Sequence, residues 1–262
     1  MTSVTIITRD GTASGARTLA QEVPVAVEVN GIGYAVMMMT PADLDAFARG
    51  FMLTERLADS AADVLEAEAV ELEAGWVLRV TLSPPCAHRI SDRVRHRTSD
   101  TGCGLCGIAS LDSLRRPAPV APPVAIAPGA LFEALERLRD AQPLNAETSA
   151  VHAAAFCDAS GSIVAAYEDV GRHNALDKLV GGLARDRLNA AAGFILVTSR
   201  VSFEMVDKAL VSGASMLVGI SAPTTMAVEH AHAHGLTLAA LARRDSILVL
   251  NDPGGCFAPT DP

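Results

Sequence analysis

The stretch "GFILVTSRVSFEMVDKAL", residues 193–210, decides the fold class of this chain. It opens on an uninterrupted apolar run that ends at Val197, and such a run predicts a short strand buried on both faces. The polar residues 198–202 then open a helix that continues through residues 203–210. A buried strand that passes through a polar turn into an amphipathic helix is the repeating unit of an α/β fold.

The same alternation extends to both sides of this stretch. Helical patterns fill most of the gaps between the apolar runs, and a helix containing Leu131, Leu135 and Leu138 precedes the first of them. The further predicted strands cover residues 162–170, 215–221, 236–241 and 246–250. We therefore predict a three-layer α/β domain over residues 130–262.

Residues 1–116 predict a smaller, mixed domain, which makes the chain α+β as a whole. Residues 22–39 and 68–82 each show two strands around a short turn, and the Asn-Gly turn of the first is a strong hairpin signal. A helix between them is expected to begin at Pro41. Prolines recur through residues 117–129, which excludes a helix there and predicts a semi-rigid linker between the two domains.

Composition excludes several classes of protein. The 262 residues are 50% hydrophobic and carry a formal charge of −9, which disfavours binding to the phosphates of a nucleic acid. The amino terminus does not resemble a signal peptide, and the apolar runs are too short for a membrane helix. Five cysteines do not suggest a disulfide framework, so we expect a protein of the reducing cytoplasm.

A glycine-rich segment, "TGCGLCG", holds Cys103 and Cys106. We expect it to lie in a mobile, exposed loop that spans about residues 86–110. Cys-x-x-Cys alone is compatible with metal binding, with disulfide exchange and with sulfur carriage. A zinc site would need two further ligands, such as Cys86 and His88, but the typical second Cys-x-x-Cys pair is absent, so we expect no bound metal.

Polar residues follow three predicted strands at the point where each strand ends. They occupy residues 168–174, 198–202 and 221–225. Ligands of open α/β sheets bind beyond the carboxyl ends of the strands, and free N–H groups at helix starts favour anions. Helix capping alone is the simplest alternative. Arg172 and Arg200 favour an anion pocket, because capping requires no guanidinium whereas a bidentate phosphate contact does.

Five motifs, in order along the chain, resemble the formate dehydrogenase accessory protein family, FdhD. They are "EVPVAVEVNGIGYAVMMMTPADLDAFARGF", "TGCGLCG", "EDVGRHNALDKLVG", "TSRVSFEMVDKAL" and "SAPTTMAVEHAHAHGLTLAALARRD". The resemblance covers about residues 20–250. It implies a sulfurtransferase that receives persulfide sulfur from a cysteine desulfurase. The sulfur then passes to the molybdenum bis(molybdopterin guanine dinucleotide) cofactor of apo formate dehydrogenase. The family also implies a carboxyl-terminal domain similar to the cytidine deaminase fold.

The resemblance extends to single residues. It implies that Cys103 carries the persulfide and that Cys106 assists or releases the sulfur. The strand-end residues would bind the cofactor, with a guanine nucleotide as a mimic: Arg172, His173, Asn174, Thr198, Ser199, Arg200, Ser202, Leu241, Ala242, Arg243, Arg244, Asp245 and Ser246. Two guanines in one cofactor suggest a homodimer. Zinc deaminases use His-x-Glu, but Ala154 stands two residues after His152, so deaminase chemistry is not expected.

Two other functions remain open on the residues alone. A thiol–disulfide oxidoreductase would use the Cys-x-x-Cys pair, whereas a non-catalytic cofactor chaperone would need the pocket but not the thiols. Among the remaining motifs, His230, His232 and His234 are expected to form a solvated helix end, with the first and last on one face. Cys157 is expected in the core, and Cys256 receives no role.

Overall fold

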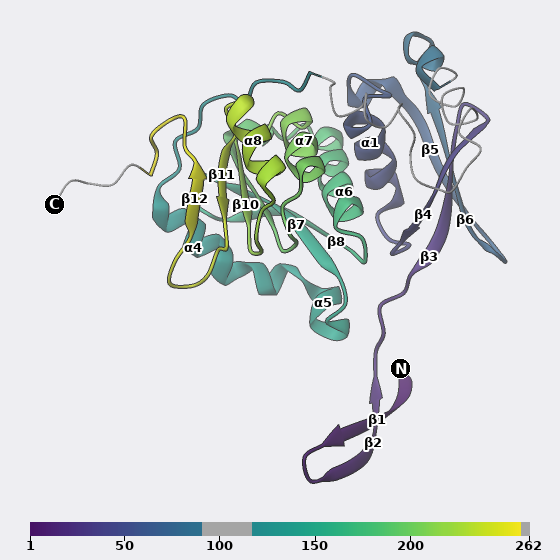
Figure 1. The fold of residues 1–262 in the computed structure, drawn as a ribbon. Helices are drawn as coiled ribbons and strands as arrows, with labels where there is room; N and C mark the ends of the chain where they lie inside the picture. Colours follow the sequence, from purple (N-terminus) through teal and green to yellow (C-terminus); the bar gives the residue numbers. More distant parts are fainter. Residues whose placement is uncertain (91–116, 258–262) are drawn as a thin grey trace.

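The computed structural model describes residues 1–90 and 117–257, and within these ranges its strands form three sheets (Figure 1). Cys103 and Cys106 lie outside the described residues, as does most of the predicted loop. No helix in the described ranges is long and apolar enough to cross a membrane.

The carboxyl-terminal part contains a six-stranded sheet of order β12-β11-β10-β9-β7-β8. Strands β9, β10 and β11 are parallel, whereas β7 is antiparallel to both of its neighbours and β12 is antiparallel to β11. The strands are β7 (His152–Asp158), β8 (Ile163–Asp169), β9 (Gly193–Val197), β10 (Met216–Gly219), β11 (Thr237–Ala240) and β12 (Leu248–Asn251).

Helices cover both faces of this sheet, as Figure 1 shows. On one face lie α6 (Arg172–Arg185), α7 (Phe203–Val211) and α8 (Thr225–Ala233). On the other face α4 (Pro128–Arg137) packs Leu131 and Ala134 against alternate residues of the same strands. Short helices η2 (Leu138–Ala141), α5 (Pro143–Thr148) and η3 (Ala190–Ala192) complete this part. The predicted three-layer α/β arrangement is confirmed.

The strand directions bring the predicted polar segments to one edge of the sheet. Because β7 runs opposite to β8 and to β9, the carboxyl ends of β8, β9, β10 and β11 all meet at that edge. The start of β7, at His152, lies there too, between the ends of β8 and β9. We call this the polar edge.

The amino-terminal part contains a four-stranded sheet of order β4-β3-β6-β5. The strands are β3 (Val23–Val29), β4 (Ile32–Met39), β5 (Val64–Leu72) and β6 (Gly75–Leu82), with η1 (Ala61–Asp63) before β5. Both predicted hairpins are confirmed, and Asn30 (φ 49°) with Gly31 (φ 78°) supplies the first turn. Helix α1 (Leu44–Thr54) packs Phe47 on this sheet. The helix begins at Leu44 and not at Pro41, because the backbone of Asp43 has a left-handed conformation that a right-handed helix does not allow.

Helices α1 and α6 lie side by side and join the two parts (Figure 1). Their backbones approach each other at glycines. A Cβ atom on Gly50 would lie 1.8 Å from the Asp177 carbonyl oxygen, and one on Gly181 would lie 1.8 Å from the Ala46 carbonyl oxygen. Only glycine allows this approach, so the two backbones fix the position of the parts relative to each other.

Gly50→Ala is therefore expected to destabilise the protein by about 1–3 kcal/mol, because the added methyl group forces the two helices apart. Chemical denaturation monitored by circular dichroism measures the free energy of unfolding. Gly33→Ala is the matched control, since nothing lies within 4 Å of its added Cβ. Equal stability of the two variants would show that the crossing is not tight.

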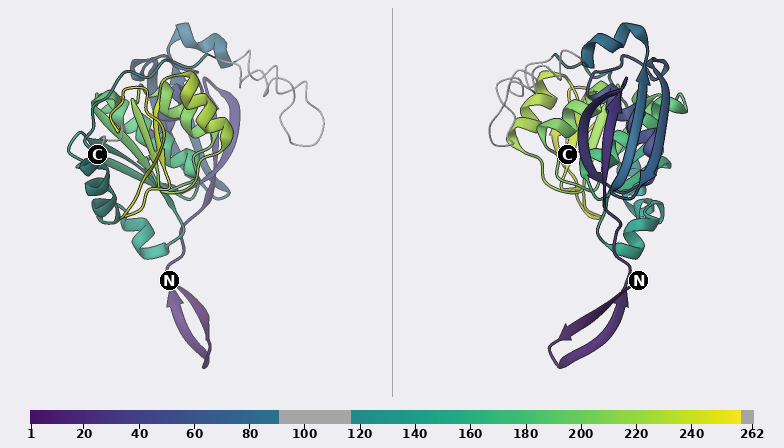
Figure 2. Two further views of the ribbon diagram at one scale, coloured as in Figure 1. Left: turned by 60° about the vertical axis from the view of Figure 1, so that its left-hand side comes forward. Right: turned by 90° about the vertical axis from the view of Figure 1, so that its right-hand side faces the viewer.

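Three segments differ from the sequence-based expectation. Residues 2–17 form an exposed hairpin, β1 (Thr2–Thr8) and β2 (Gly11–Arg17), that stands away from the body (Figures 1 and 2). Residues 84–90 are helical and bury Cys86 and Ile90, so the exposed loop predicted from residue 86 is wrong for these residues. The predicted linker has no helix or strand through residue 127, but it packs Ile126 into the core. Helix α4 then begins at Pro128, inside the predicted linker.

Candidate functional site

The three predicted helix starts at the polar edge differ in how they are capped. Thr224 caps α8 by accepting a hydrogen bond from the Ala227 N–H at 3.3 Å. Neither Gly171 before α6 nor Ser202 before α7 provides a side-chain cap. Capping therefore accounts for the third strand end, while the first N–H groups of α6 and α7 are not used by a capping side chain.

Buried polar atoms without partners gather at these two uncapped starts. They are Nε of Arg172 and Oγ of Ser202. Beside them, Nε2 of His173 lies 2.9 Å from Oε2 of Glu204 and pairs with that carboxylate. Buried polar groups normally have partners, so this group of donors fits a site that an anionic ligand would complete.

Arg200 extends into solvent from the turn between β9 and α7. Within the described ranges, neither Arg200 nor Arg172 takes part in an ion pair. The imidazole of His173 lowers the pKa of Glu204, and Arg172 lowers it further. The part of the edge formed by the starts of α6 and α7 thus carries the guanidinium groups of Arg172 and Arg200, with Glu204 paired to His173 beside them.

His152 belongs to this group of residues, although the predicted site did not include it. It is half-buried at the start of β7, and Ala153 beside it donates its N–H to Oγ1 of Thr198 at 2.9 Å. Burial lowers the pKa of His152, and the charges of Arg172, Arg200 and His173 lower it further. The strand order places His152 between the end of β8, which leads to Arg172 and His173, and the end of β9, which leads to Arg200.

Other predicted residues serve the fold of the polar edge. Oγ1 of Thr198 joins β9 to β7, and Ser199 is buried with its hydroxyl donating to the carbonyl of Arg200 at 3.1 Å. The amide nitrogen of Asn174 donates to the carbonyl of Met38 and to Asp169, both at 3.0 Å. These three residues hold the backbone that positions the site.

Residues 241–246 lie at the same edge, after β11. Leu241 is left-handed (φ 50°), Ala242 is buried, and Arg243, Arg244, Asp245 and Ser246 are exposed. The Arg243 guanidinium donates to the carbonyls of Ile220 and Ala242. Strands β10, β9 and β7 separate this segment from the end of β8. It therefore lies at the far side of the edge from Arg172.

A buried ion pair stands directly beneath the edge. Nζ of Lys178 lies 2.6 Å from Oδ2 of Asp169, and both side chains are fully buried. Asp169 also accepts the N–H groups of Thr40 at 3.1 Å and of Gly171 at 2.7 Å. This pair ties the loop before α1 to the start of α6.

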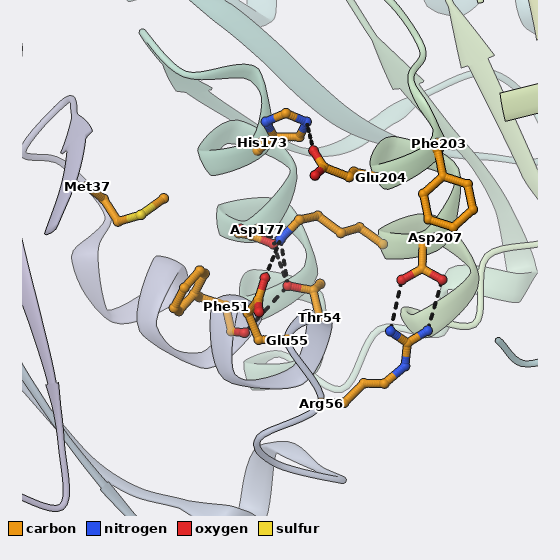
Figure 3. Close-up of a pocket in the computed structure, with 11 residues that line it drawn as sticks. Met37, Phe51, Thr54, Glu55, Arg56, His173, Asp177, Phe203, Glu204 and Asp207 are labelled. Atoms are coloured by element: carbon orange, nitrogen blue, oxygen red, sulfur yellow. Dashed lines mark hydrogen bonds and ion pairs between the residues drawn. The ribbon is translucent and has the colours of Figure 1, made fainter. Parts of the chain in front are cut away.

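A cavity of about 260 Å³ lies beside the edge, between α1, α6 and α7 (Figure 3). Its walls include Phe51, Phe203 and Met37, and its polar lining includes Glu55, Glu204 and Asp207. His173 and Glu204 face each other at its rim, so the cavity and the polar edge share these two side chains. The cavity was not predicted from the sequence, because its lining comes from separate segments, namely β4 and the three helices.

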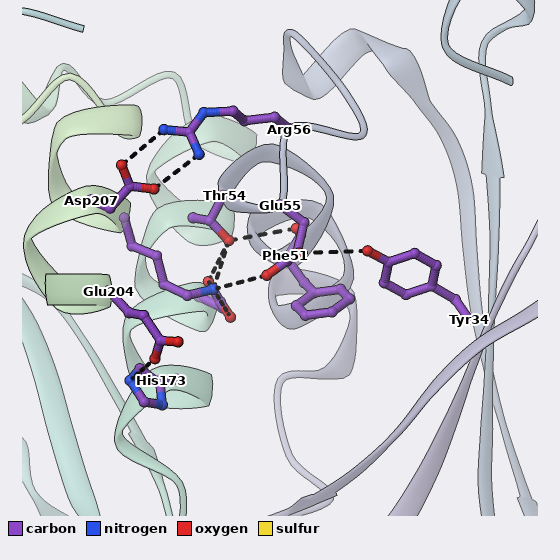
Figure 4. A network of polar contacts seen from close by, with 10 residues as sticks. Tyr34, Phe51, Thr54, Glu55, Arg56, His173, Glu204 and Asp207 are labelled. Carbon is purple, nitrogen blue, oxygen red and sulfur yellow. Dashed lines mark hydrogen bonds and ion pairs between the residues drawn. The ribbon is translucent and has the colours of Figure 1, made fainter. Parts of the chain in front are cut away.

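A second buried ion pair forms the floor of this cavity. Nζ of Lys208 lies 2.8 Å from both carboxylate oxygens of Asp177 and 2.9 Å from Oγ1 of Thr54. Figure 4 shows Thr54 within this network of polar contacts. Burial would lower the pKa of Lys208, but Asp177 and Glu55 outweigh it and raise that pKa. Burial also raises the pKa of Asp177, yet an ionised carboxylate fits the geometry, because both oxygens accept from Lys208.

At the outer wall Arg56 reaches Asp207 with two hydrogen bonds of 2.9 Å (Figure 3). Nε2 of His230 lies 3.2 Å from Asp207, and its ring packs 4.3 Å from that of Phe203. His230 is thus buried, and the solvated helix end predicted for it is wrong. His230 and His234 do share a face, with ring centroids 4.5 Å apart, while His232 is exposed.

The cysteines within the described ranges are free thiols. Cys157 is buried as predicted, and burial raises its pKa to about 12. Cys256 is half-buried, and its sulfur lies 2.7 Å from the carbonyl oxygen of Val124. Cys86 is buried beside Asp59 and Asp63, whereas His88 is exposed. Two residues apart on a helix, Cys86 and His88 point in different directions, which disfavours them as ligands of one zinc ion.

Comparison with known proteins gives consistent matches over nearly the whole chain. The FdhD/NarQ family matches residues 20–255. A protein of Bordetella petrii named sulfur carrier protein FdhD is 41% identical over 244 residues, which cover 93% of this chain and 88% of that protein. One of the same name from Xanthomonas euvesicatoria pv. vesicatoria is 44% identical over 236 residues, covering 90% and 84%.

A solved structure shares the fold. The crystal structure of a protein from Desulfotalea psychrophila, described as a candidate formate dehydrogenase accessory protein, superposes with a TM-score of 0.76 at 24% identity. The match covers 97% of this chain and 96% of that one.

Proposed function

This chain belongs to the FdhD/NarQ family, and from that premise we propose that it is a sulfurtransferase that serves formate dehydrogenase maturation. Relatives that are more than 40% identical are named sulfur carriers. The observation that carries the proposal within this chain is the polar edge. Two uncapped helix starts, two guanidinium groups and buried donors without partners converge there.

The proposed cargo is the molybdenum bis(molybdopterin guanine dinucleotide) cofactor, bound through its guanine nucleotide ends. The uncapped N–H groups of α6 and α7 suit phosphate oxygens, and Arg172 and Arg200 suit the same groups through bidentate contacts. The buried Oγ of Ser202 and Nε of Arg172 would gain partners from such a ligand. GDP is the simplest probe of this site.

The proposed sulfur chemistry takes place at Cys103. Its thiolate attacks the terminal sulfur of a persulfide on a cysteine desulfurase, forms a new S–S bond, and releases the desulfurase thiolate. No net oxidation occurs in this step. The Cys106 thiolate then attacks the inner sulfur of the Cys103 persulfide, which forms a Cys103–Cys106 disulfide and releases the outer sulfur as hydrosulfide for the cofactor. A cellular thiol reduces the disulfide. Low-pKa thiolates are the reactive form, and the neighbouring arginines 93, 95 and 97 would favour that form.

Partners follow from this scheme. A cysteine desulfurase must supply the sulfur, and apo formate dehydrogenase must receive the loaded cofactor. A two-ended cofactor favours a homodimer, and reactive thiols favour a reducing cytoplasm. We also propose that the α/β part is related to the cytidine deaminase fold, without its chemistry, because Ala154 stands two residues after His152.

A non-catalytic cofactor chaperone is the second candidate function. The polar edge favours it equally, because that edge includes no thiol among the described residues. It differs from the sulfurtransferase in one respect that can be tested, since a chaperone does not require Cys103. A thiol–disulfide oxidoreductase, by contrast, would leave the polar edge without a function.

Arg200→Ala is expected to weaken GDP binding by about 10- to 100-fold, because an arginine–phosphate contact contributes about 1.5–3 kcal/mol. Isothermal titration calorimetry measures the dissociation constant. Arg79→Ala is the matched control, because Arg79 is an exposed arginine on β6 that pairs with Glu68. Equal affinity of the Arg200→Ala variant and the parent would remove Arg200 from the binding site.

A further inference from the structure

His152 occupies a central position at the polar edge. It opens β7, which lies between β8 and β9, and its cross-strand partner on β8 is Asp169. Arg172 and His173 come from the start of α6 after β8, and Arg200 comes from the turn after β9. The imidazole is half-buried and has no hydrogen-bond partner among the residues of the described ranges.

The charges around this imidazole are mostly positive. Arg172 and His173 follow the end of β8 on one side of it, Arg200 follows the end of β9 on the other, and the charges of all three lower its pKa. Of the nearby carboxylates, Glu204 on α7 lies against His173, and Asp169 on β8 is bound by Lys178, Asn174 and two backbone N–H groups. Neither carboxylate is therefore available as a close partner for a protonated His152.

We propose that His152 takes up a proton when phosphate groups bind between Arg172 and Arg200, so that its imidazolium becomes a third cationic partner of the anion. This inference rests on the proposed function, since the phosphates are those of the guanine nucleotide. The proton comes from the solvent, and the site returns it when the ligand leaves.

The direction of the proton transfer follows from electrostatics. In the free protein, burial and the two guanidinium groups lower the pKa of His152, so the imidazole is neutral near pH 7. A bound diphosphate reverses the sign of the local charge. An opposite charge within about 4–6 Å shifts the pKa of such a group by about 1–3 units toward the charged form. Binding and protonation of His152 therefore favour each other.

Calorimetry of GDP and of inorganic pyrophosphate in buffers with different ionisation enthalpies tests this proposal. The dependence of the binding enthalpy on the buffer gives the number of protons taken up. We expect up to about one proton near pH 7 and an affinity that rises as the pH falls, by at most about tenfold per pH unit. His152→Gln should remove this uptake and flatten the pH dependence, while binding well above pH 7 stays close to that of the parent.

Two further variants make the assignment specific. His232→Gln is the matched control, because His232 is exposed on α8 and should behave as the parent does. His173→Gln should retain the uptake. If His152→Gln does not fold, the proton-sensitive NMR signal of His152 in the parent, recorded with and without pyrophosphate, reports the same change.

The outcomes separate this inference from the proposed function. Binding of GDP without proton uptake, or uptake that persists in His152→Gln, contradicts the role of His152 and leaves the nucleotide site intact. If the uptake disappears only in His173→Gln, the proton binds to His173 and not to His152, which also overturns the inference. Failure of both GDP and pyrophosphate to bind overturns the nucleotide site and this inference together.

Discussion

Replacing Cys103 by alanine is expected to abolish formate dehydrogenase activity in cells that lack the native protein. The variant removes the sulfur atom on which the proposed persulfide forms, and we assign no other residue to sulfur carriage at that position. GDP affinity and the thermal unfolding midpoint should remain close to those of the parent. We expect this because the glycine-rich sequence around Cys103 predicts an exposed loop, where loss of a thiol costs little packing.

Complementation of a deletion strain, alongside calorimetry on the purified variants, measures both quantities. Cys256→Ser is the matched control, because its half-buried sulfur only contacts the carbonyl of Val124 and has no place in the proposed chemistry. It should rescue activity fully. Full rescue by Cys103→Ala would instead leave the non-catalytic chaperone as the function.

Lys208→Met is expected to lower the free energy of unfolding by about 3–5 kcal/mol, because it leaves the buried carboxylate of Asp177 without its charged partner. The effect is large because the Asp177 carboxylate is buried between α1, α6 and α7 and both of its oxygens accept from Lys208. Denaturation in urea measures it. The exposed Arg79–Glu68 pair is the control, and Glu68→Gln should cost less than about 1 kcal/mol.

A double variant tests the cause of this loss. Asp177→Leu combined with Lys208→Met removes both charges, so it should recover a large part of the lost stability. A loss in the double variant equal to the sum of the two single losses would show that the ion pair is not the source of the effect. A loss below about 1 kcal/mol in Lys208→Met would contradict the buried character of the site.

The α/β part was the most predictable region of the chain. Apolar runs such as that ending at Val197 indicate strands buried on both faces, and all five predicted strands are present. Strand β7 was not predicted, because its run of three alanines, beginning at Ala153, has little strand propensity. Its position between β8 and β9 stabilises it as a strand, and the sequence of β7 itself does not reveal these neighbours.

The position of the polar edge was also predictable, since the carboxyl ends of parallel strands meet at one edge. The roles of individual residues there depend on distant contacts. Asn174 donates to the carbonyl of Met38, which lies 136 positions away, and this contact gives no signal in the motif. His152 joins Arg172 and Arg200 only because β7 runs antiparallel between β8 and β9.

The cavity between α1, α6 and α7 could not be predicted for the same reason. Its floor pairs Asp177 with Lys208 and Thr54, and its wall pairs Arg56 with Asp207 across 151 positions. Adjacent in sequence, Asp177 and Lys178 instead form two different ion pairs, as helix geometry requires. To predict this cavity, one would first have to know that α1 and α6 cross at Gly50 and Gly181.

Mass spectrometry of the purified protein after incubation with a cysteine desulfurase and cysteine tests sulfur transfer most directly. Sulfurtransferase function predicts that the peptide containing Cys103 gains the mass of one sulfur atom, that a thiol reductant removes it, and that Cys103→Ala gains nothing. Cys256→Ser should gain it as the parent does. A desulfurase that turns over cysteine while the Cys103 peptide keeps its original mass would contradict the proposed function.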